Sequence, residues 1–395
     1  MIQRFSFGHP FPTQSVVLSL PAESGPIPFL TPDGSGWQLT LSEQAAVYGL
    51  GEMPRGINKR GWHYIANNTD ESRHSEDKLS FYGAHNFLLV RDGSTCFGLF
   101  VDFPGKVYYD IGYSRHDLLS FHTETPDYDL YLLSGGSENA ICREFRTLIG
   151  RSYIPPSGIR SGTEPLGLQD RGGRTGSCTP VQGARPAAGH DLYGHRVYAG
   201  LCRLHRKQGT FSRPYKALRR PESAGHPAGA HHRCRRARRP NDSTCTEGLE
   251  KGYFCKKADG TPFVAAVWPG KAYFADFLRP EVREWFGHKY KALTDCGIEG
   301  FWNDMNEPSL FYSPERLRAF LDDMAALREK DNIEQEEFFP RVVGGAMGLM
   351  NSPADYASFY HEADGRKVRH DQVHNLYGGS MTRAAGGSLA DLAPA

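Results

Sequence analysis

Gly297-Ile-Glu-Gly-Phe-Trp-Asn-Asp-Met-Asn-Glu-Pro308 is the stretch of sequence that decides the fold. A short apolar run ends in Trp302, and two carboxylates follow three residues apart, Asp304 and Glu307. A buried strand that ends in acidic side chains is typical of a (β/α)8 barrel, whose catalytic side chains lie at the C-terminal ends of the strands. We therefore expect Asp304 and Glu307 at the mouth of a barrel.

A carboxylate in that place can attack or stabilise an oxocarbenium-like sugar carbon. This chemistry requires Asp304 to stay ionised at neutral pH, which hydrogen bonds or a nearby cation would secure. A structural interpretation stands beside it, in which Asp304 caps the next turn and Glu307 pairs with a basic neighbour. Composition alone leaves both interpretations open.

The overall composition excludes several classes of protein. The 395 residues include 46 basic and 45 acidic side chains, so the charge balance gives no case for nucleic-acid or membrane binding. The eight cysteines show no metal-ligand spacing, and we expect free thiols, no metal and no cofactor. The N-terminus lacks the apolar core of a signal peptide, which predicts a cytoplasmic protein.

Residues 1–135 are predicted to form a β-sandwich, because many short strands alternate with Gly and Pro. Residues 15–20 and 128–133 have strand composition. Residues 87–91 and 96–101 flank a turn in which Gly93 allows a positive φ, which predicts a hairpin. Ser137 is expected to cap a helix that ends near Leu148, with Ile141, Phe145 and Leu148 on its apolar face.

Residues 157–240 differ abruptly in composition. They hold 15 arginines and 2 lysines but only 4 acidic residues, a net charge of +13, and they show little helical or strand periodicity. One interpretation is a disordered basic linker that binds nucleic acid. It lacks the interleaved aromatic residues of a single-strand groove, which argues against that function.

After residue 247 the pattern of an α/β protein returns. Pro280 is expected in the first turn of a helix that Gly297 closes, directly before the strand 298–302. Its apolar face would consist of Val282, Trp285, Phe286, Tyr290 and Leu293. A second helix should start at Ser313-Pro314 and turn Leu317, Phe320, Leu321 and Met324 toward a core.

The stretch Trp302-Asn-Asp-Met-Asn-Glu-Pro308 closely resembles the nucleophile signature of glycoside hydrolase family 31, the retaining α-glucosidases, α-xylosidases and their relatives. Residues 1–156 and about 247–385 share this resemblance. The other motifs that carry it are Tyr48-Gly-Leu-Gly-Glu52, Tyr82-Gly-Ala-His-Asn-Phe87, Leu148-Ile-Gly-Arg151, Val267-Trp-Pro-Gly270, Phe274-Ala-Asp-Phe277 and His374-Asn-Leu-Tyr-Gly378.

The resemblance implies a role for each matching residue. Asp304 would be the nucleophile and Glu307 its supporting carboxylate, while Asp70 would contact the sugar or the leaving group. Trp268, Trp302 and Met305 would line the sugar pocket, although large aromatic residues also pack in ordinary cores. The substrate would be an α-glucoside or an oligosaccharide, and the oligomeric state stays open.

The same resemblance exposes two departures from the family pattern. The first three barrel strands are expected within 157–240 and are not recognisable there. Codons can be chosen so that a frame shifted by one nucleotide gives family-like strand sequences near 162–174, 189–201 and 225–236, which suggests a compensated frameshift. The general acid is expected beyond residue 395, so no residue of this sequence is assigned to that role.

These observations predict an N-terminal β-sandwich of the galactose-mutarotase-like type over 1–150 and an incomplete (β/α)8 barrel over 151–395, with 157–240 out of frame and disordered. The predicted function is that of a retaining α-glucosidase with little or no activity. The alternative is a non-catalytic carbohydrate-binding remnant. If the printed sequence is the true one, the first three barrel strands should not form.

Overall fold

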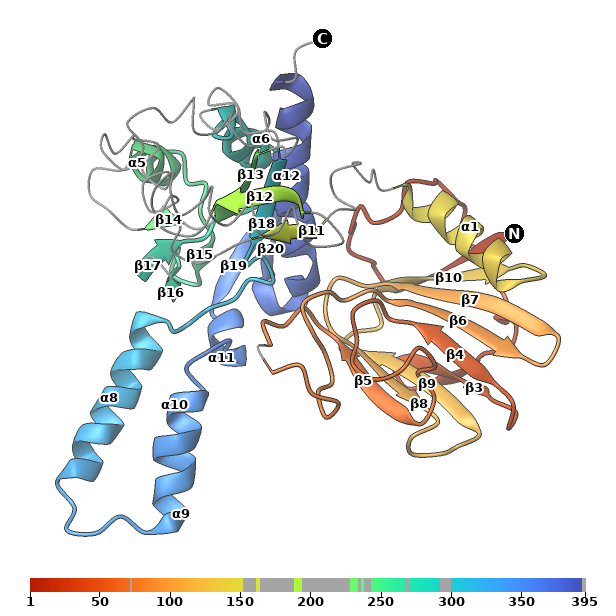
Figure 1. Ribbon diagram of the computed structural model, residues 1–395, viewed down its shortest axis with the longest axis horizontal. Helices are drawn as coiled ribbons and strands as arrows, with labels where there is room; N and C mark the ends of the chain where they lie inside the picture. Colours follow the sequence, from red (N-terminus) through yellow and green to blue (C-terminus); the bar gives the residue numbers. More distant parts are fainter. Residues whose placement is uncertain are drawn as a thin grey trace. The chain divides into compact units, whose positions relative to one another are not determined.

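The computed structural model describes residues 1–71, 73–151, 161–163, 188–193, 228–233, 236–237, 243–267, 270–291 and 300–392 (Figure 1). The chain divides into two compact units. Met1–Ser152 and Asp371–Leu376 form the first, which we call the sandwich unit. Tyr153–His370 and Tyr377–Ala395 form the second, the barrel unit. No helix in the described part of the chain has both the length and the hydropathy needed to cross a bilayer.

The sandwich unit consists of two antiparallel five-stranded sheets, which confirms the predicted β-sandwich. The first sheet has the order β1 (Ile2–Phe7), β10 (Tyr128–Ser134), β7 (Thr95–Asp102), β6 (Phe87–Asp92) and β4 (Ala46–Gly49). The second has the order β2 (Thr31–Asp33), β3 (Gly36–Thr40), β9 (Leu118–Thr123), β8 (Val107–Ile111) and β5 (Trp62–Ala66). Buried and half-buried residues alternate in β8, whereas β7 and β10 are buried along almost their whole length, and side chains from both sheets form one apolar core.

Two local predictions in this unit are confirmed. Strands β6 and β7 pair as a hairpin, and Gly93 in its turn has a φ of 56°. Helix α1 (Glu138–Ile149) begins after Ser137, whose hydroxyl oxygen accepts a hydrogen bond from the Ala140 backbone N–H at 3.3 Å. The buried Ile141 and Leu148 of α1 pack against the first sheet.

The strand predicted over residues 15–20 is wrong. This segment forms no strand; it packs by its side chains, with Val16, Leu18 and Leu20 against the cluster that contains Leu148. The Val17 backbone N–H donates to the Leu148 carbonyl at the end of α1, 2.9 Å away. The apolar alternation was therefore a true signal of one-sided burial, but the backbone binds a helix end rather than a neighbouring strand.

A short segment near the C-terminus also belongs to the sandwich unit. Asn375, in the 3-10 helix η4 (His374–Leu376), accepts a hydrogen bond from the Asn68 backbone N–H at 2.8 Å. Its side-chain amide donates to the carbonyls of Ala66, at 3.1 Å, and Gly105, at 2.7 Å. One asparagine thus joins three backbone groups of this unit, which explains why residues 371–376 pack with it.

The barrel unit contains a parallel four-stranded sheet with the order β11 (Ser161–Thr163), β12 (Ala188–Tyr193), β13 (Ala228–Arg233) and β18 (Gly300–Asp304). The expectation that no strand forms in the basic segment is therefore wrong for these three stretches. A strand ladder is made by backbone groups, so short stretches rich in Ala and Gly can pair whatever their periodicity. Disorder is also predicted for 157–240, and apart from these strands and the short β14 (Arg236–Ala237) that segment lies outside the described residues.

Further elements of the barrel unit surround that sheet. They are α5 (Ser243–Glu250), β14 (Arg236–Ala237), β15 (Lys256–Lys257), β16 (Val264–Val267), β17 (Gly270–Tyr273), β19 (Phe359–Ala363), β20 (Arg366–Arg369), α6 (Pro280–His288) and α12 (Tyr377–Leu392). Helix α6 packs on α12, and Val282, Trp285, Phe286 and Tyr290 are buried as predicted. Leu293 and Gly297, from the same prediction, lie outside the described residues.

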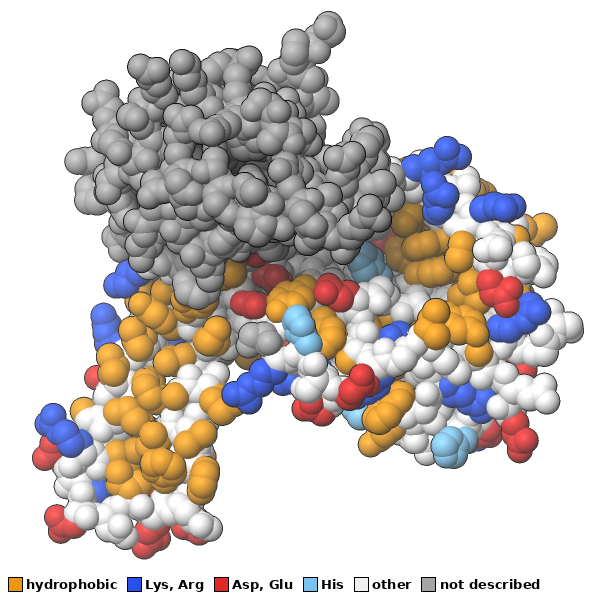
Figure 2. Space-filling model, viewed as in Figure 1, with side chains coloured by type: hydrophobic (Ala, Val, Ile, Leu, Met, Phe, Trp, Pro, Cys, Tyr) orange, Lys and Arg blue, Asp and Glu red, His pale blue; other side chains and the backbone are white. Residues whose placement is uncertain are grey.

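A helical hairpin projects from the barrel unit (Figure 1). Its elements are α8 (Pro314–Arg328), α9 (Gln335–Glu337), the π-helix η2 (Phe338–Gly344) and α10 (Gly345–Met347), and α11 (Pro353–Tyr356) follows. The prediction that the apolar stripe of α8 faces a core is wrong for Leu321, which is 54% exposed. Helix α8 contacts η2 of the other arm and strand β16, and Figure 2 shows hydrophobic side chains on the surface of the hairpin.

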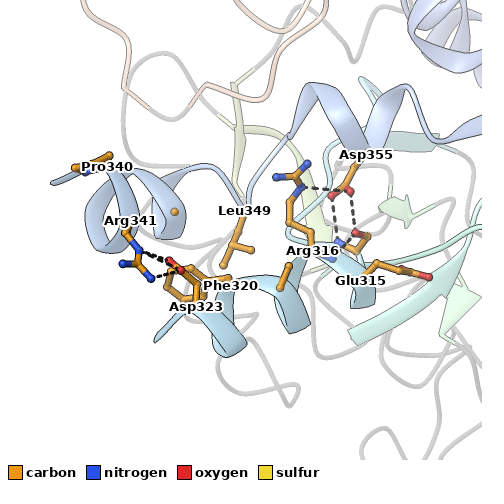
Figure 3. Close-up of a pocket in the computed structure, with 11 residues that line it drawn as sticks. Glu315, Arg316, Phe320, Asp323, Pro340, Arg341, Leu349 and Asp355 are labelled. Carbon is orange, nitrogen blue, oxygen red and sulfur yellow. Dashed lines mark hydrogen bonds and ion pairs between the residues drawn. The ribbon is translucent and has the colours of Figure 1, made fainter. Parts of the chain in front are cut away.

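Ion pairs join the arms of the hairpin and its base. The Arg341 guanidinium binds Asp323 of α8, and Arg316 approaches the buried carboxylate of Asp355 at 3.4 Å (Figure 3). Asp355 also accepts hydrogen bonds from the hydroxyl and the backbone N–H of Ser313, which caps α8. A cavity of about 540 Å³ lies between the arms, and none of the predicted catalytic residues lines it.

Candidate active site

Strand β18 carries the predicted nucleophile to the end of the parallel sheet. It pairs with β13 in a register that places Asp304 opposite Arg233 and Asn303 opposite His232. Asp304 is the last residue of the strand, and its side chain is partly exposed. Barrel enzymes hold their catalytic groups at this end of a parallel strand, and the catalytic role of Asp304 stays a prediction.

A tight turn follows the strand. Met305 has a φ of 64°, in the left-handed region that side chains seldom adopt. Its backbone N–H donates a hydrogen bond to the Asp304 carboxylate, 3.0 Å away. That contact resembles the turn-capping role considered from the sequence, and it also fixes the direction of the carboxylate. Asp304 thus has a defined orientation that either interpretation can use.

Helix α6 supports the strand from one side. The Tyr290 hydroxyl, which follows α6, donates a hydrogen bond to the Asn303 side-chain oxygen at 2.6 Å. Tyr290 is fully buried, and that burial raises the pKa of its hydroxyl, so the group is a neutral donor. This bond holds the residue directly before Asp304.

The far side of the turn packs against the start of α12. A Cβ atom placed on Gly378 would lie 2.9 Å from the Asn306 carbonyl oxygen, so only glycine fits without a shift. Glu307 is 7% exposed and precedes Pro308, whose carbonyl accepts a hydrogen bond from the Tyr356 hydroxyl at 2.7 Å. The turn is therefore anchored by α6, by α11 and by α12.

The structure brings three of the predicted site residues together. Asp304, Met305 and Glu307 lie within one turn, and the backbone of Trp302 lies in β18. Trp268 lies outside the described residues, between β16 and β17. Asp70 belongs to the sandwich unit, in the loop after β5.

Sequence reasoning missed the residues that hold the turn, which are Tyr290, Asn303, Tyr356 and Gly378. The sequence pattern places Tyr290 on an apolar helix face and predicts no polar role for it. Gly378 belongs to the motif His374–Gly378, but its close packing is not predicted from that motif. A buried tyrosine at the end of a helical stripe could have suggested a hydrogen-bonding role, because a buried hydroxyl needs a partner.

Comparison with known protein families gives two matches. Residues 26–110 match the glycosyl hydrolase 31 N-terminal galactose mutarotase-like domain. Residues 228–392 match the glycosyl hydrolases family 31 TIM-barrel domain, from β13 through α12. Together the two matches confirm the predicted combination of a sandwich with a barrel domain.

The chain is also similar to curated α-glucosidases. It is 27% identical over 339 residues to alpha-glucosidase 2 of Bacillus thermoamyloliquefaciens, an alignment that covers 83% of this chain and 41% of that protein. It is 24% identical over 345 residues to an alpha-glucosidase of Saccharolobus solfataricus, covering 86% of this chain and 46% of that protein. The chain thus spans less than half the length of these relatives.

Solved structures show the same fold. A family 31 dextranase of Flavobacterium johnsoniae, complexed with glucose, superimposes with a TM-score of 0.71 at 18% identity, covering 93% of this chain and 40% of that one. A cycloalternan-degrading enzyme from Trueperella pyogenes gives a TM-score of 0.65 at 14% identity, covering 90% and 49%. With both of its domains matched to one family, the chain belongs to glycoside hydrolase family 31.

Proposed function

We propose that this chain carries the nucleophile side of a retaining α-glucosidase site, with Asp304 as the attacking carboxylate. One observation carries the proposal: Asp304 ends β18, and the Met305 N–H holds its carboxylate within a turn that three helices anchor. The similarity to α-glucosidases supports an α-glucoside as the substrate class.

In the proposed reaction, an Asp304 carboxylate oxygen forms a bond to the anomeric carbon while the bond to the leaving group breaks. The leaving oxygen takes up a proton from a general acid. Water then cleaves the glycosyl-aspartate ester from the same face that the leaving group occupied, and two inversions give net retention. Glu307, buried three residues after the nucleophile, would support the turn electrostatically.

The remaining assignments belong to the same proposal. Met305, Trp302 and Trp268 would line the pocket for the sugar that is transferred, and Asp70 would contact the sugar or the leaving group. No residue of this chain is assigned as the general acid. We therefore expect little or no turnover of substrates whose leaving group needs a proton, such as maltose and 4-nitrophenyl α-glucoside.

The test exploits leaving groups. Fluoride departs without protonation, so release of fluoride from α-glucosyl fluoride requires a nucleophile and a sugar pocket but no general acid. We expect fluoride release from α-glucosyl fluoride but not from its β-anomer, with α-glucose as the first product in a proton NMR time course. Release should fall to background in Asp304→Asn and stay unchanged in the matched control Asp322→Asn, on the exposed face of α8.

Two outcomes would refute the assignment. Fluoride release that is unaffected by Asp304→Asn would mean that Asp304 is not the nucleophile. β-Glucose as the first product would mean that the reaction is not retaining. Binding of maltose in a calorimetric titration, together with no fluoride release, would instead favour the non-catalytic carbohydrate-binding alternative.

A further inference from the structure

A buried cluster of metal-ligand side chains lies in the barrel unit, away from the turn of Asp304 in sequence. Cys255 precedes β15, Asp276 precedes α6, and His361 lies in the middle of β19. One ligand atom from each of the three residues lies within 4.8 Å of the other two. Each residue is at most 2% exposed. Three separate segments of the chain thus converge on one small volume.

The convergence is centred on one ring nitrogen. His361 Nδ1 lies 2.7 Å from an Asp276 carboxylate oxygen and 3.6 Å from the Cys255 sulfur. A ring nitrogen presents either one proton or one lone pair. A single N–H can serve the carboxylate but not the sulfur as well, whereas a metal ion in front of Nδ1 would bind both.

The charges of the three groups favour a divalent cation. Burying an ionised carboxylate is costly unless a positive charge balances it. A metal site would hold a thiolate at Cys255, a carboxylate at Asp276 and a neutral imidazole at His361. Those ligands carry two negative charges, which one divalent ion neutralises.

The atoms behind the cluster have the arrangement of an outer shell around metal ligands. His361 Nε2 lies 2.8 Å from Nδ1 of His370, which is fully buried, and this bond fixes the ring orientation. The second Asp276 oxygen accepts the Glu362 backbone N–H at 2.7 Å. Hydrogen bonds of this kind orient the ligands in metalloproteins and tune the metal that they hold.

We propose that Cys255, Asp276 and His361 bind one structural Zn²⁺ ion. Sulfur and imidazole ligands select zinc over calcium or magnesium. Bonds of about 2.0 Å to nitrogen and about 2.3 Å to sulfur at tetrahedral angles place the two ligand atoms about 3.5 Å apart. The observed 3.6 Å between sulfur and nitrogen fits this geometry, and the carboxylate must move outward by about half an ångström.

The fourth ligand can come from the backbone. The Ala275 carbonyl oxygen lies 3.7 Å from the Cys255 sulfur.

The spacing of the cysteines in the sequence could not reveal this site, because the cluster takes one residue from each of three separate segments. The site is independent of the proposed nucleophile, so either proposal can fail without the other.

The experiment uses the whole chain of 395 residues. After treatment with a chelator, the protein is titrated with Co²⁺, which occupies zinc sites and absorbs visibly, and zinc content is measured separately by mass spectrometry. We expect one equivalent of either metal, the absorption of four-coordinate Co²⁺ and a thiolate-to-cobalt charge-transfer band. Cys255→Ser should abolish that band, and Cys245→Ser, a buried cysteine of another cluster, should leave it unchanged.

Further variants keep the proposal open to refutation. His370→Phe should weaken binding about 10- to 100-fold, because it removes the bond that orients His361. If Cys255→Ser fails to fold, as circular dichroism would show, a chain in which Cys255 is the only remaining cysteine should keep the charge-transfer band. Failure of the unmutated chain to bind stoichiometric metal, or a band that survives Cys255→Ser, would overturn the proposal.

Discussion

Tyr290 donates a 2.6 Å hydrogen bond to the side chain of Asn303, and this bond ties the end of helix α6 to the residue that precedes Asp304. Removing the hydroxyl in Tyr290→Phe leaves the Asn303 oxygen without this donor. We expect a loss of about 1–3 kcal/mol in the free energy of unfolding, measured by urea denaturation. Tyr113→Phe, at an exposed tyrosine of the sandwich unit, should change it by less than about 0.5 kcal/mol. Equal effects of the two variants would contradict the assigned role of the bond.

Gly378 provides a second test of how the turn is held. Gly378→Ala brings a Cβ to 2.9 Å from the Asn306 carbonyl oxygen, so α12 or the turn must shift, at about 1–3 kcal/mol. Gly379→Ala meets no atom within 4 Å and should stabilise α12 by about 0.5–1 kcal/mol through helix propensity alone. Thermal denaturation of the two variants should move in opposite directions. A stabilised Gly378→Ala would show that the close packing is not present.

Asp102 in β7 should make the stability of the sandwich unit depend on pH. Burial is the main cause that raises its pKa to about 6, although the Thr13 hydroxyl donates to it at 2.6 Å and opposes the shift. The folded state therefore binds this proton more tightly than the unfolded state. Its stabilisation is complete below about pH 4 and is lost as the pH rises through about 6.

Asp102→Asn keeps the acceptor for Thr13 and removes the titration. Above pH 6 we expect it to stabilise the unit by about 2 kcal/mol and to flatten the pH profile of urea denaturation. Asp33→Asn, in the exposed strand β2, should leave both quantities unchanged. An Asp102→Asn variant that is less stable at pH 7 would mean that the carboxylate is ionised and favourable where it lies.

The reading frame of the basic segment can be tested on the gene. The composition of 157–240 predicts about one extra nucleotide near codon 157 and one lost near codon 240. Resequencing the gene should reveal both, and a chain with the corrected frame should release more fluoride from α-glucosyl fluoride than the printed one. An intact, unshifted read through both codons would refute the frameshift.

The sequence predicted those parts of the fold that depend on local pattern. The hairpin around Gly93, the cap at Ser137 and the strand that delivers Asp304 all follow from signals within a few residues. Residues 15–20 were misjudged because alternation reports burial on one side and not the partner of the backbone. Leu321 was misjudged because an apolar stripe shows that a helix packs, but not how completely its partner covers it.

The supports of the candidate site could not be predicted, because they join side chains of different helices and strands. Asn303 meets Tyr290 across a helix–strand connection, and Gly378 reaches Asn306 from 72 positions later in the numbering. The same holds for Cys255, Asp276 and His361. Strands β11, β12 and β13 were not predicted, because their sequences show no strand periodicity. Backbone groups can pair beside β18 without such a side-chain pattern.

Covalent labelling of the nucleophile tests the central claim most directly. The chain of 395 residues is treated with 5-fluoro-α-glucosyl fluoride and is then digested for peptide mass spectrometry. The leaving group of this reagent needs no acid, and the glycosyl ester that it forms is slow to hydrolyse. Our account predicts one added fluoroglucosyl group on the peptide that contains Asp304, and none in Asp304→Asn. Labelling of a different carboxylate, or no labelling of a folded chain that binds α-glucosides, would contradict it.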